Sequence, residues 1–388
     1  MKKSNIYLVS FLLVIVGCGE GKQSSDDIII VDVTKSYSSK KELILQDFMD
    51  VEYVALETND DFINQGLVMD ISKNFILVRN GILFDGDIFV YDRTGKALRK
   101  INRKGQGPEE YIIVAGGVID EDNNEIYINN SVKREILVYD LFGNFKRSLK
   151  QEKENIFTFY RDFYNFDNDN LICYDELNEE RVFVIISKRD GSITKKIKIQ
   201  FKEKKVLRKK NNNDNNSSSP ATPTRTITTY NGNWIFFDFS SDTVYTLLPD
   251  FSLRPFIVRT PSIQSMDPED FLLLRVLSDR YYFMETIRNE FDFNANTGFP
   301  SKFMMYDKKE KAFFGYNVYN GDFSTKKEIY MNRLFPVNNE IESWYPIESY
   351  QLVESYKNGE LKDGKLKEIA AKLNNEDNRV IMLVKHKK

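Results

Sequence analysis

Short apolar runs, each followed by a glycine, recur at regular spacing along the chain. Three of these units superimpose without gaps, and their glycines lie 48 residues apart, at Gly95, Gly143 and Gly191. Glycine adopts the positive φ that a tight hairpin turn requires. Each unit is therefore predicted to be a β-strand, a turn and a return strand.

Further apolar runs, preceded by Asp, Asn or Gly, extend this pattern over most of the chain. The runs upstream of the hairpins are Phe75–Val78, Glu125–Ile128, Leu171–Tyr174 and Trp234–Phe237, and looser hairpin copies lie at Tyr245–Pro249 and Phe303–Asp307. Repeats of about 40–50 residues with four strands each are typical of β-propeller blades. We therefore predict an all-β fold, a six-bladed β-propeller, with seven blades as the alternative. A β-solenoid fits poorly because 48 residues is long for one rung.

The two ends of this repeat region supply one strand each. Val51–Leu56 is an apolar run near the start, and Val380–Val384 is another at the end. Pairing the two strands in one blade would close the ring and remove open sheet edges. We expect the propeller to extend over residues 28–388.

Two segments interrupt the strand pattern. Residues 202–225 begin with a basic run and continue through an Asn/Ser-rich stretch, which predicts a disordered insertion. Residues Leu361–Leu373 place Leu366, Ile369 and Ala370 on one face, which predicts one short amphipathic helix before the closing strand.

The first residues have the pattern of an export signal. Lys2 and Lys3 precede the apolar segment Ile6–Val16, which is too short to cross a bilayer as a helix. Ile15–Cys18 then resembles a bacterial lipobox, in which two apolar residues and a small one precede the cysteine. We expect residues 1–17 to be a lipoprotein signal peptide, Cys18 to be lipidated, and polar residues 18–27 to form a flexible tether.

Composition narrows the possible chemistry. The 55 basic and 58 acidic residues give a net charge of −3, so the chain lacks the excess of positive charge that is typical of nucleic-acid-binding proteins. The one histidine, His386, lies in a charged tail and is expected to be solvated, so zinc sites and histidine-dependent catalysis are disfavoured. Cys173 lies in an apolar run and is expected to be a small buried hydrophobic residue.

Four features are candidates for a site, and each has a structural alternative. The oxygen-rich segments Asp120–Asn124 and Asp167–Asn170 could bind Ca²⁺, but hairpin turns also favour Asp and Asn. The glycine-rich loop Gly105–Tyr111 is better explained as a turn between blades than as a phosphate cradle, because Pro108 removes a backbone donor. The aromatic pairs Trp344–Tyr345 and Tyr281–Tyr282 could stack on sugars, but aromatic residues also fill the cores of blades.

Several segments together are similar to the six-bladed β-propeller lipoproteins of Bacteroides-type bacteria. They are the lipobox, Val51–Thr58, Gly105–Tyr111 and Asn375–Arg379. The blades also resemble repeats of the NHL type. This resemblance implies the propeller fold and a place in the cell envelope, but no catalytic residues.

From these observations we expect a lipoprotein anchored in the outer membrane, monomeric, that acts as a binding or scaffold protein for a protein partner or a glycan. No cofactor is expected. The alternative is a Ca²⁺-dependent propeller hydrolase or lyase with carboxylate and amide groups in the central channel, where loops from all blades converge.

Overall fold

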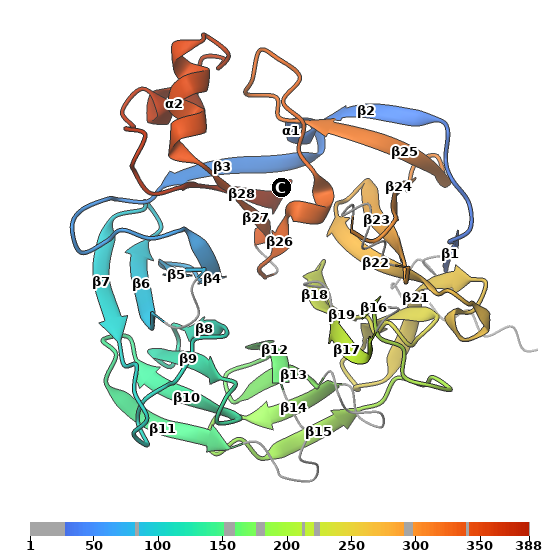
Figure 1. Cartoon of the computed structure of the whole chain (residues 1–388), viewed down its shortest axis with the longest axis horizontal. Helices are drawn as coiled ribbons and strands as arrows, with labels where there is room; N and C mark the ends of the chain where they lie inside the picture. Colours follow the sequence, from blue (N-terminus) through green and yellow to red (C-terminus); the bar gives the residue numbers. More distant parts are fainter. Residues whose placement is uncertain are drawn as a thin grey trace, which may run out of the picture.

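Six β-sheets stand side by side in a closed ring around a central axis (Figure 1). This computed structural model describes residues 28–81, 85–150, 160–175, 183–211, 214–220, 226–290, 298–338 and 341–387. The predicted signal peptide, the tether and Cys18 lie outside these residues. The ring confirms the predicted six-bladed β-propeller.

Blades 1 to 3 each have four antiparallel strands that follow one another from the axis outward. Blade 1 contains β4 (Leu67–Ile71), β5 (Phe75–Arg79), β6 (Asp87–Asp92) and β7 (Ala97–Asn102). Blade 2 contains β8 (Gly117–Asp120), β9 (Glu125–Asn130), β10 (Glu135–Asp140) and β11 (Phe145–Lys150). Blade 3 contains β12 (Tyr160–Asn165), β13 (Asn170–Asp175), β14 (Phe183–Ser187) and β15 (Ile193–Ile197).

Blades 4 to 6 follow the same plan, with additions from the N-terminal segment. Blade 4 contains β18 (Ile227–Tyr230), β19 (Asn233–Phe236), β20 (Thr243–Leu247) and β21 (Leu253–Thr260). Blade 5 contains β22 (Asp270–Leu277), β23 (Tyr281–Arg288), β24 (Ser301–Asp307) and β25 (Ala312–Tyr319). Blade 6 contains β26 (Phe335–Pro336), β27 (Ile341–Ile347) and β28 (Val380–His386), with β3 (Met49–Ala55) as its outer strand.

The hydrophobic core is divided among the junctions between blades. Six clusters of buried residues each combine side chains from two neighbouring blades. The inner strands are therefore buried on both faces: all six residues of β9 and five of the six in β10 are buried. The outer strand β11 has the alternating pattern of a strand with one face on the core and one in solvent.

The repeated glycines have two structural roles at once. Gly95, Gly143 and Gly191 lie in the turns between the third and fourth strands, with φ of 89°, 86° and 80°. Each glycine also packs against the outer strand of the preceding blade. A Cβ at Gly143, for example, would lie 2.8 Å from Cγ2 of Ile101 in β7. The glycine therefore recurs every 48 residues because each blade needs it both in the turn and at the contact with the preceding blade.

We expect Gly143→Ala to destabilise the protein more than Gly232→Ala. Gly232 also has positive φ, 74°, but a Cβ there would meet no atom within 4 Å. Its substitution should cost about 1–2 kcal/mol of unfolding free energy through backbone strain alone. Gly143→Ala should cost a further 1–3 kcal/mol, roughly, because Ile101 must shift. Denaturant unfolding of both variants tests this, and equal losses would show that the junction tolerates the methyl group.

The ring closes as predicted, by pairing of its N- and C-terminal strands. β28 lies between β27 and β3 and is antiparallel to both, with Val380 opposite Ala55 and Val384 opposite Val51. No edge of β28 is therefore exposed.

The N-terminal segment also braces two other blades, which the sequence pattern did not predict. β1 (Ile29–Asp32) runs parallel to β21 on the outside of blade 4, and β2 (Lys40–Ile44) runs parallel to β25 on the outside of blade 5. Residues 28–55 thus connect the outer edges of blades 4, 5 and 6. The short helix α1 (Leu45–Phe48) joins β2 to β3.

The prediction of one C-terminal helix over Leu361–Leu373 was wrong in number and length. Two helices lie between β27 and β28: α2 (Ser349–Lys357), which was not predicted, and the shorter α3 (Lys365–Ala370). The predicted apolar face is correct, because Leu366, Ile369 and Ala370 are buried in the core cluster between blades 5 and 6. Two short 3₁₀ turns, Ile263–Ser265 and Met331–Arg333, complete the elements.

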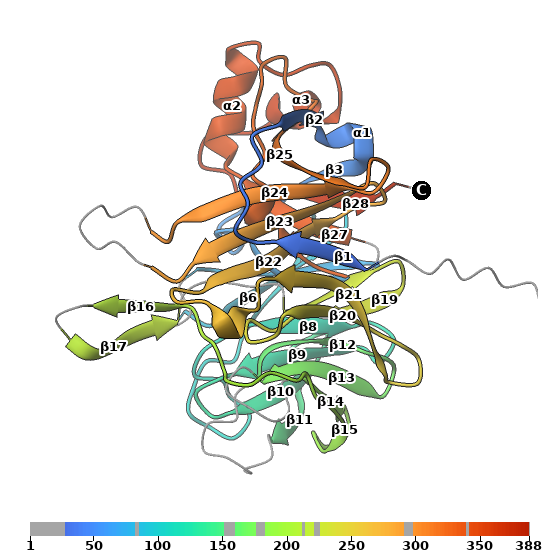
Figure 2. The same cartoon turned by 90° about the vertical axis from the view of Figure 1, so that its right-hand side faces the viewer.

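The described part of residues 202–225 contains two short strands. β16 (Arg208–Asn211) and β17 (Asp214–Pro220) form an antiparallel hairpin that projects from the ring (Figure 2). Before the hairpin, Lys204 Nζ lies 2.7 Å from the buried carboxylate of Asp238, and Leu207 is buried in the cluster between blades 4 and 5. The basic run is fixed at this point because the buried Asp238 requires a cation.

Candidate functional site

A cavity of about 160 Å³ lies on the propeller axis, among the innermost strands. Blades 1, 2, 3, 4 and 6 line it with the residues Asp70, Ile71, Ser72, Val118, Ile119, Tyr164, Asn165, Ile227, Thr228, Thr229, Trp234, Pro336, Val337 and Asn338. Most of the polar members lie near the ends of first strands, where the chain turns toward the second strand. The cavity is therefore at one mouth of the central channel, close to the turns between first and second strands.

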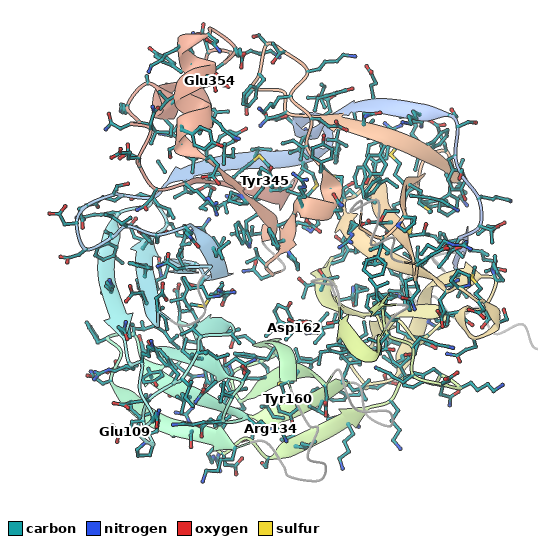
Figure 3. All side chains as sticks on the ribbon, viewed as in Figure 1. Glu109, Arg134, Tyr160, Asp162, Tyr345 and Glu354 are labelled. Carbon is teal, nitrogen blue, oxygen red and sulfur yellow. The ribbon has the colours of Figure 1, made fainter. Side chains whose placement is uncertain are left out.

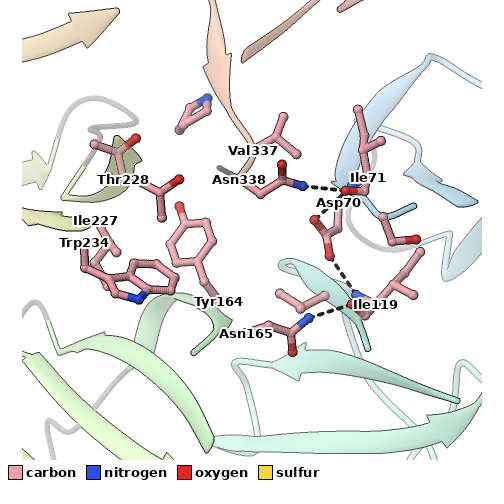
Figure 4. Close-up of a pocket in the computed structure, with 14 residues that line it drawn as sticks. Asp70, Ile71, Ile119, Tyr164, Asn165, Ile227, Thr228, Trp234, Val337 and Asn338 are labelled. Atoms are coloured by element: carbon pink, nitrogen blue, oxygen red, sulfur yellow. Dashed lines mark hydrogen bonds between the residues drawn. The ribbon is translucent and has the colours of Figure 1, made fainter. Parts of the chain in front are cut away.

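Three polar side chains at this mouth connect neighbouring blades (Figure 4). Asn338 Nδ2 of blade 6 donates to the carbonyl of Ile71 in blade 1, at 2.7 Å. The carboxylate of Asp70 in blade 1 accepts the backbone N–H of Ile119 in blade 2, at 2.8 Å. Asn165 Nδ2 of blade 3 donates to the carbonyl of the same Ile119, at 2.6 Å. These bonds fix the shape of the cavity wall and use one amide N–H of each asparagine.

Asp70 is the one charged residue of the cavity lining. Burial raises its pKa to about 6, although the hydrogen bonds from the backbone N–H groups of Ile119 and Ile71 act in the opposite direction. The nearby carboxylate of Glu121 raises the pKa further. Asp70 is therefore ionised at neutral pH at an energetic cost that a cation in the cavity would relieve.

Aromatic rings form the wall of the cavity opposite Asp70. Figure 4 shows Tyr164 facing across the cavity toward Asp70, with Trp234 beside it. Trp234 is stacked on Phe166 at 5.7 Å, and Phe166 is 6.1 Å from Phe251. A row of aromatic side chains thus extends from the cavity toward the rim between blades 3 and 4. The alternation of β12 directs Phe163 into the junction between blades 2 and 3, and Tyr164 into the cavity.

A second, more open cavity of about 670 Å³ lies between blades 2 and 3. It is lined by a network of paired charges. Arg147 Nη1 and Nη2 bind the two carboxylate oxygens of Glu125 at 2.6 and 2.7 Å, and Lys188 Nζ lies 2.6 Å from Asp120 Oδ2. Burial alone would raise the pKa of Glu125, but hydrogen bonds from Arg147, Lys146 and Tyr127 lower it to about 2. These groups hold two blades together and are already satisfied by one another.

The structure explains most of the sequence candidates as parts of the framework. Asp120 and Asp167 accept backbone N–H groups of their own turns, from Asn123 at 3.2 Å and Asp169 at 2.9 Å, as the turn interpretation predicted. The loop Gly105–Tyr111 joins β7 to β8 and thus blade 1 to blade 2. Within the described residues, no group of three or more His, Cys, Asp or Glu side chains is placed to hold a metal ion.

The remaining candidates are also core residues. Trp344, Tyr281 and Tyr282 are at most 5% exposed, which supports the core interpretation over a sugar platform. Cys173 is fully buried, and burial raises the pKa of its thiol, as expected for an inert cysteine. His386 differs from the expectation of a solvated side chain: its ring packs 5.7 Å from Tyr230, and both ring nitrogens are buried.

The fold and the cavity define a closed six-bladed β-propeller with a pre-formed site at one channel mouth. The chain belongs to the family described as a domain of unknown function, DUF4934, whose model matches residues 28–385. No curated protein matches the sequence.

Two solved structures from Bacteroides are similar to this chain. A protein of Bacteroides fragilis, which its name describes as a candidate exported protein, has a TM-score of 0.60 at 17% identity, over 93% of this chain and 100% of that one. A member of the DUF4221 family from Bacteroides vulgatus has a TM-score of 0.48 at 12% identity, over 88% of this chain and 99% of that one. The first likeness supports the propeller fold. Along the described part of the chain, no helix has the length and apolar character needed to cross a bilayer.

Proposed function

We propose that this chain is a lipid-anchored protein of the bacterial outer membrane whose propeller binds a group of a partner molecule in the channel cavity. The observation that carries this proposal is the cavity itself. Its wall is held by hydrogen bonds across blade boundaries, and an aromatic side faces a single carboxylate. Concave sites with mostly apolar walls and a few fixed polar groups are typical of ligand binding.

The envelope location is supported by two independent features. In the lipobox, Cys18 follows the apolar segment Ile6–Val16 after one small residue, Gly17. The structurally similar Bacteroides fragilis protein is named as a candidate exported protein. We propose a monomer held by acyl chains on Cys18, with a protein partner favoured over a glycan for the reasons given in the next subsection.

The direction of β1 supports an orientation of the propeller on the membrane. β1 is parallel to β21, and β21 starts from the turn between the third and fourth strands of blade 4. Turns of this kind and those between first and second strands lie on the same face, because successive strands are antiparallel. The chain therefore enters β1 from the face that carries the turns between first and second strands, near which the cavity lies. A lipid on Cys18, about ten residues earlier, would keep this face near the membrane.

Membrane fractionation of a Cys18→Ser variant tests the anchor. We expect the native chain to incorporate labelled fatty acid and to sediment with outer membranes. The variant should lose the label and leave the membrane fraction, because no acyl chain can attach. Labelling that persists in the variant, or native protein without label, would contradict the anchor.

Photo-crosslinking in native cells tests the binding site. A photoreactive phenylalanine analogue at Trp234 replaces one aromatic side chain of the cavity by another. The same analogue at Tyr356, which is 40% exposed on α2, is the matched control outside the cavity. We expect a defined adduct from position 234 and not from position 356. No adduct at 234, or the same adducts at both positions, would argue against binding in the cavity.

A further inference from the structure

The electrostatic character of the channel mouth is negative. Asp70 supplies the one charge of the cavity lining, and Glu121 lies near enough to raise its pKa. Further along the channel wall, Asp162 accepts a hydrogen bond from Thr226 at 3.3 Å, and Figure 3 shows Asp162 at the inner edge of blade 3. Among the described residues, no ion pair joins Asp70 to a basic side chain. The half-buried carboxylate thus lacks the counter-ion that a charge withdrawn from water normally has.

One basic group on a neighbouring turn, Arg93, is already engaged. Arg93 donates to the backbone carbonyl of Ser72 at 3.0 Å, and its guanidinium lies 4.0 Å from Glu52. Glu121 accepts hydrogen bonds from the backbone and side chain of Asn74, at 2.7 and 2.8 Å. Glu121 is itself a carboxylate, and among the described residues no ion pair joins Arg93 to Asp70.

The rest of the cavity wall combines apolar and aromatic side chains with the neutral polar residues Ser72, Asn165, Thr228, Thr229 and Asn338. Ile71, Ile119, Ile227 and Val337 are at most 9% exposed, yet all four border the cavity. A cavity of about 150 Å³ holds a group the size of a benzene ring. The space therefore suits a narrow chain with an apolar stem that ends in a positive charge, a combination that lysine side chains provide.

We infer that the cavity binds an alkylammonium group, of the kind that a lysine side chain of a partner protein presents, with Asp70 as its counter-ion and Tyr164 and Trp234 as its aromatic walls. This inference rests on the proposed function, because it assumes that the cavity is the binding site. Aromatic rings attract cations through their negative faces, so they add to the attraction of the carboxylate.

Other ligands fit these residues less well. A phosphate-bearing lipid headgroup would bring a second negative charge beside Asp70 and Glu121, and the lining contains no lysine, arginine or histidine to receive it. A sugar needs several donors and acceptors around its ring, and one N–H of each of the Asn165 and Asn338 amides is already used by a backbone carbonyl.

Titration with two probes of the same shape tests the inference. n-Butylammonium and n-butanol share a stem and differ in charge. The chain has two tryptophans, so a Trp344→Phe background, in the full-length protein, leaves Trp234 as the single fluorophore beside the cavity. At about pH 8, well above the pKa of Asp70, we expect butylammonium to bind at least about tenfold more tightly than butanol.

The pH dependence follows from the ionisation of Asp70. Its pKa of about 6 means that protonation removes the counter-ion at lower pH. Affinity for butylammonium should therefore fall toward pH 5, by up to about tenfold per pH unit, while affinity for butanol stays constant. Asp70→Asn should remove both the preference for the cation and this pH dependence. Asp122→Asn, an exposed carboxylate on the neighbouring turn, is the matched control and should change neither.

The outcomes separate this inference from the proposed function. Equal affinity for the two probes, or a preference that persists in Asp70→Asn, would overturn the ammonium site. If Asp70→Asn fails to fold, two other measurements still test the ammonium site. The first is the pH profile of the native protein, and the second is calorimetry on a Trp234→Leu variant, which should bind butylammonium more weakly. Tighter binding of phosphoethanolamine or N-acetylglucosamine than of butylammonium would also overturn it, yet leave the cavity as the binding site. If no probe binds and position 234 gives no crosslink, both proposals fail.

Discussion

Deletion of residues 380–388 is expected to abolish folding. The deletion removes β28, whose residues Val380–Val384 are all 0% exposed. Each fully buried side chain of this kind contributes about 1.5–3 kcal/mol, so that the five together contribute roughly 8–15 kcal/mol. The entire stability of a folded protein is typically about 5–15 kcal/mol. The deletion also exposes the facing edges of β27 and β3, which should promote aggregation.

Circular dichroism and size-exclusion chromatography of the deletion variant measure this effect. We expect no cooperative thermal transition and no soluble monomer. The matched control ends at His386 and removes only the end of the chain beyond β28, so it should melt like the native protein. A deletion variant that retains a cooperative transition would mean that the ring does not depend on its closing strand.

Lys188→Met is expected to cost about 3–5 kcal/mol of unfolding free energy, because it breaks a buried ion pair. Lys188 is 5% exposed, and its Nζ lies 2.6 Å from both Asp120 Oδ2 and the carbonyl of Asp167. Asp120 is itself 6% exposed. Methionine preserves the stem but leaves the buried Asp120 carboxylate without its cation, and it removes a contact between blades 2 and 3.

The control and the rescue variant identify the cause. Lys326→Met breaks an ion pair with Glu42 in which the side chains are 67% and 60% exposed, and it should cost far less, because water screens the pair. Adding Asp120→Asn to Lys188→Met should restore part of the lost stability, because the buried charge is then gone. Urea denaturation of the four proteins gives these values. Equal losses for Lys188→Met and Lys326→Met would show that the buried pair does not hold the blades.

The fold could be predicted because its determinants repeat along the chain. Turn geometry and contact with the preceding blade both require glycine at Gly95, Gly143 and Gly191. The spacing of these glycines therefore gives the length of one blade. The closing pair β3 and β28 could be predicted for a similar reason, because a ring of blades needs partners for its two end strands. The strands β1 and β2 could not, because each occurs once and pairs with a strand distant in sequence.

The central channel could be predicted as the place of a site, but the residues that line the cavity could not, because they come from five blades. Trp234 lies in a run that was identified only as a strand, and Asp70 follows no motif at all. The aromatic residues that were conspicuous in the sequence, Trp344 and Tyr281, fill the core instead. The burial and the charge of the residues at the channel mouth arise only when the ring closes, so they cannot be recognised in the sequence of a single repeat.

A crystal structure of the full-length protein soaked with n-butylammonium tests most directly whether the cavity is a binding site. We expect density for the probe between Tyr164 and Asp70, with its ammonium group in contact with the Asp70 carboxylate. Density for the probe only at other sites, with water between Tyr164 and Asp70 at a saturating concentration, would contradict binding in the channel cavity.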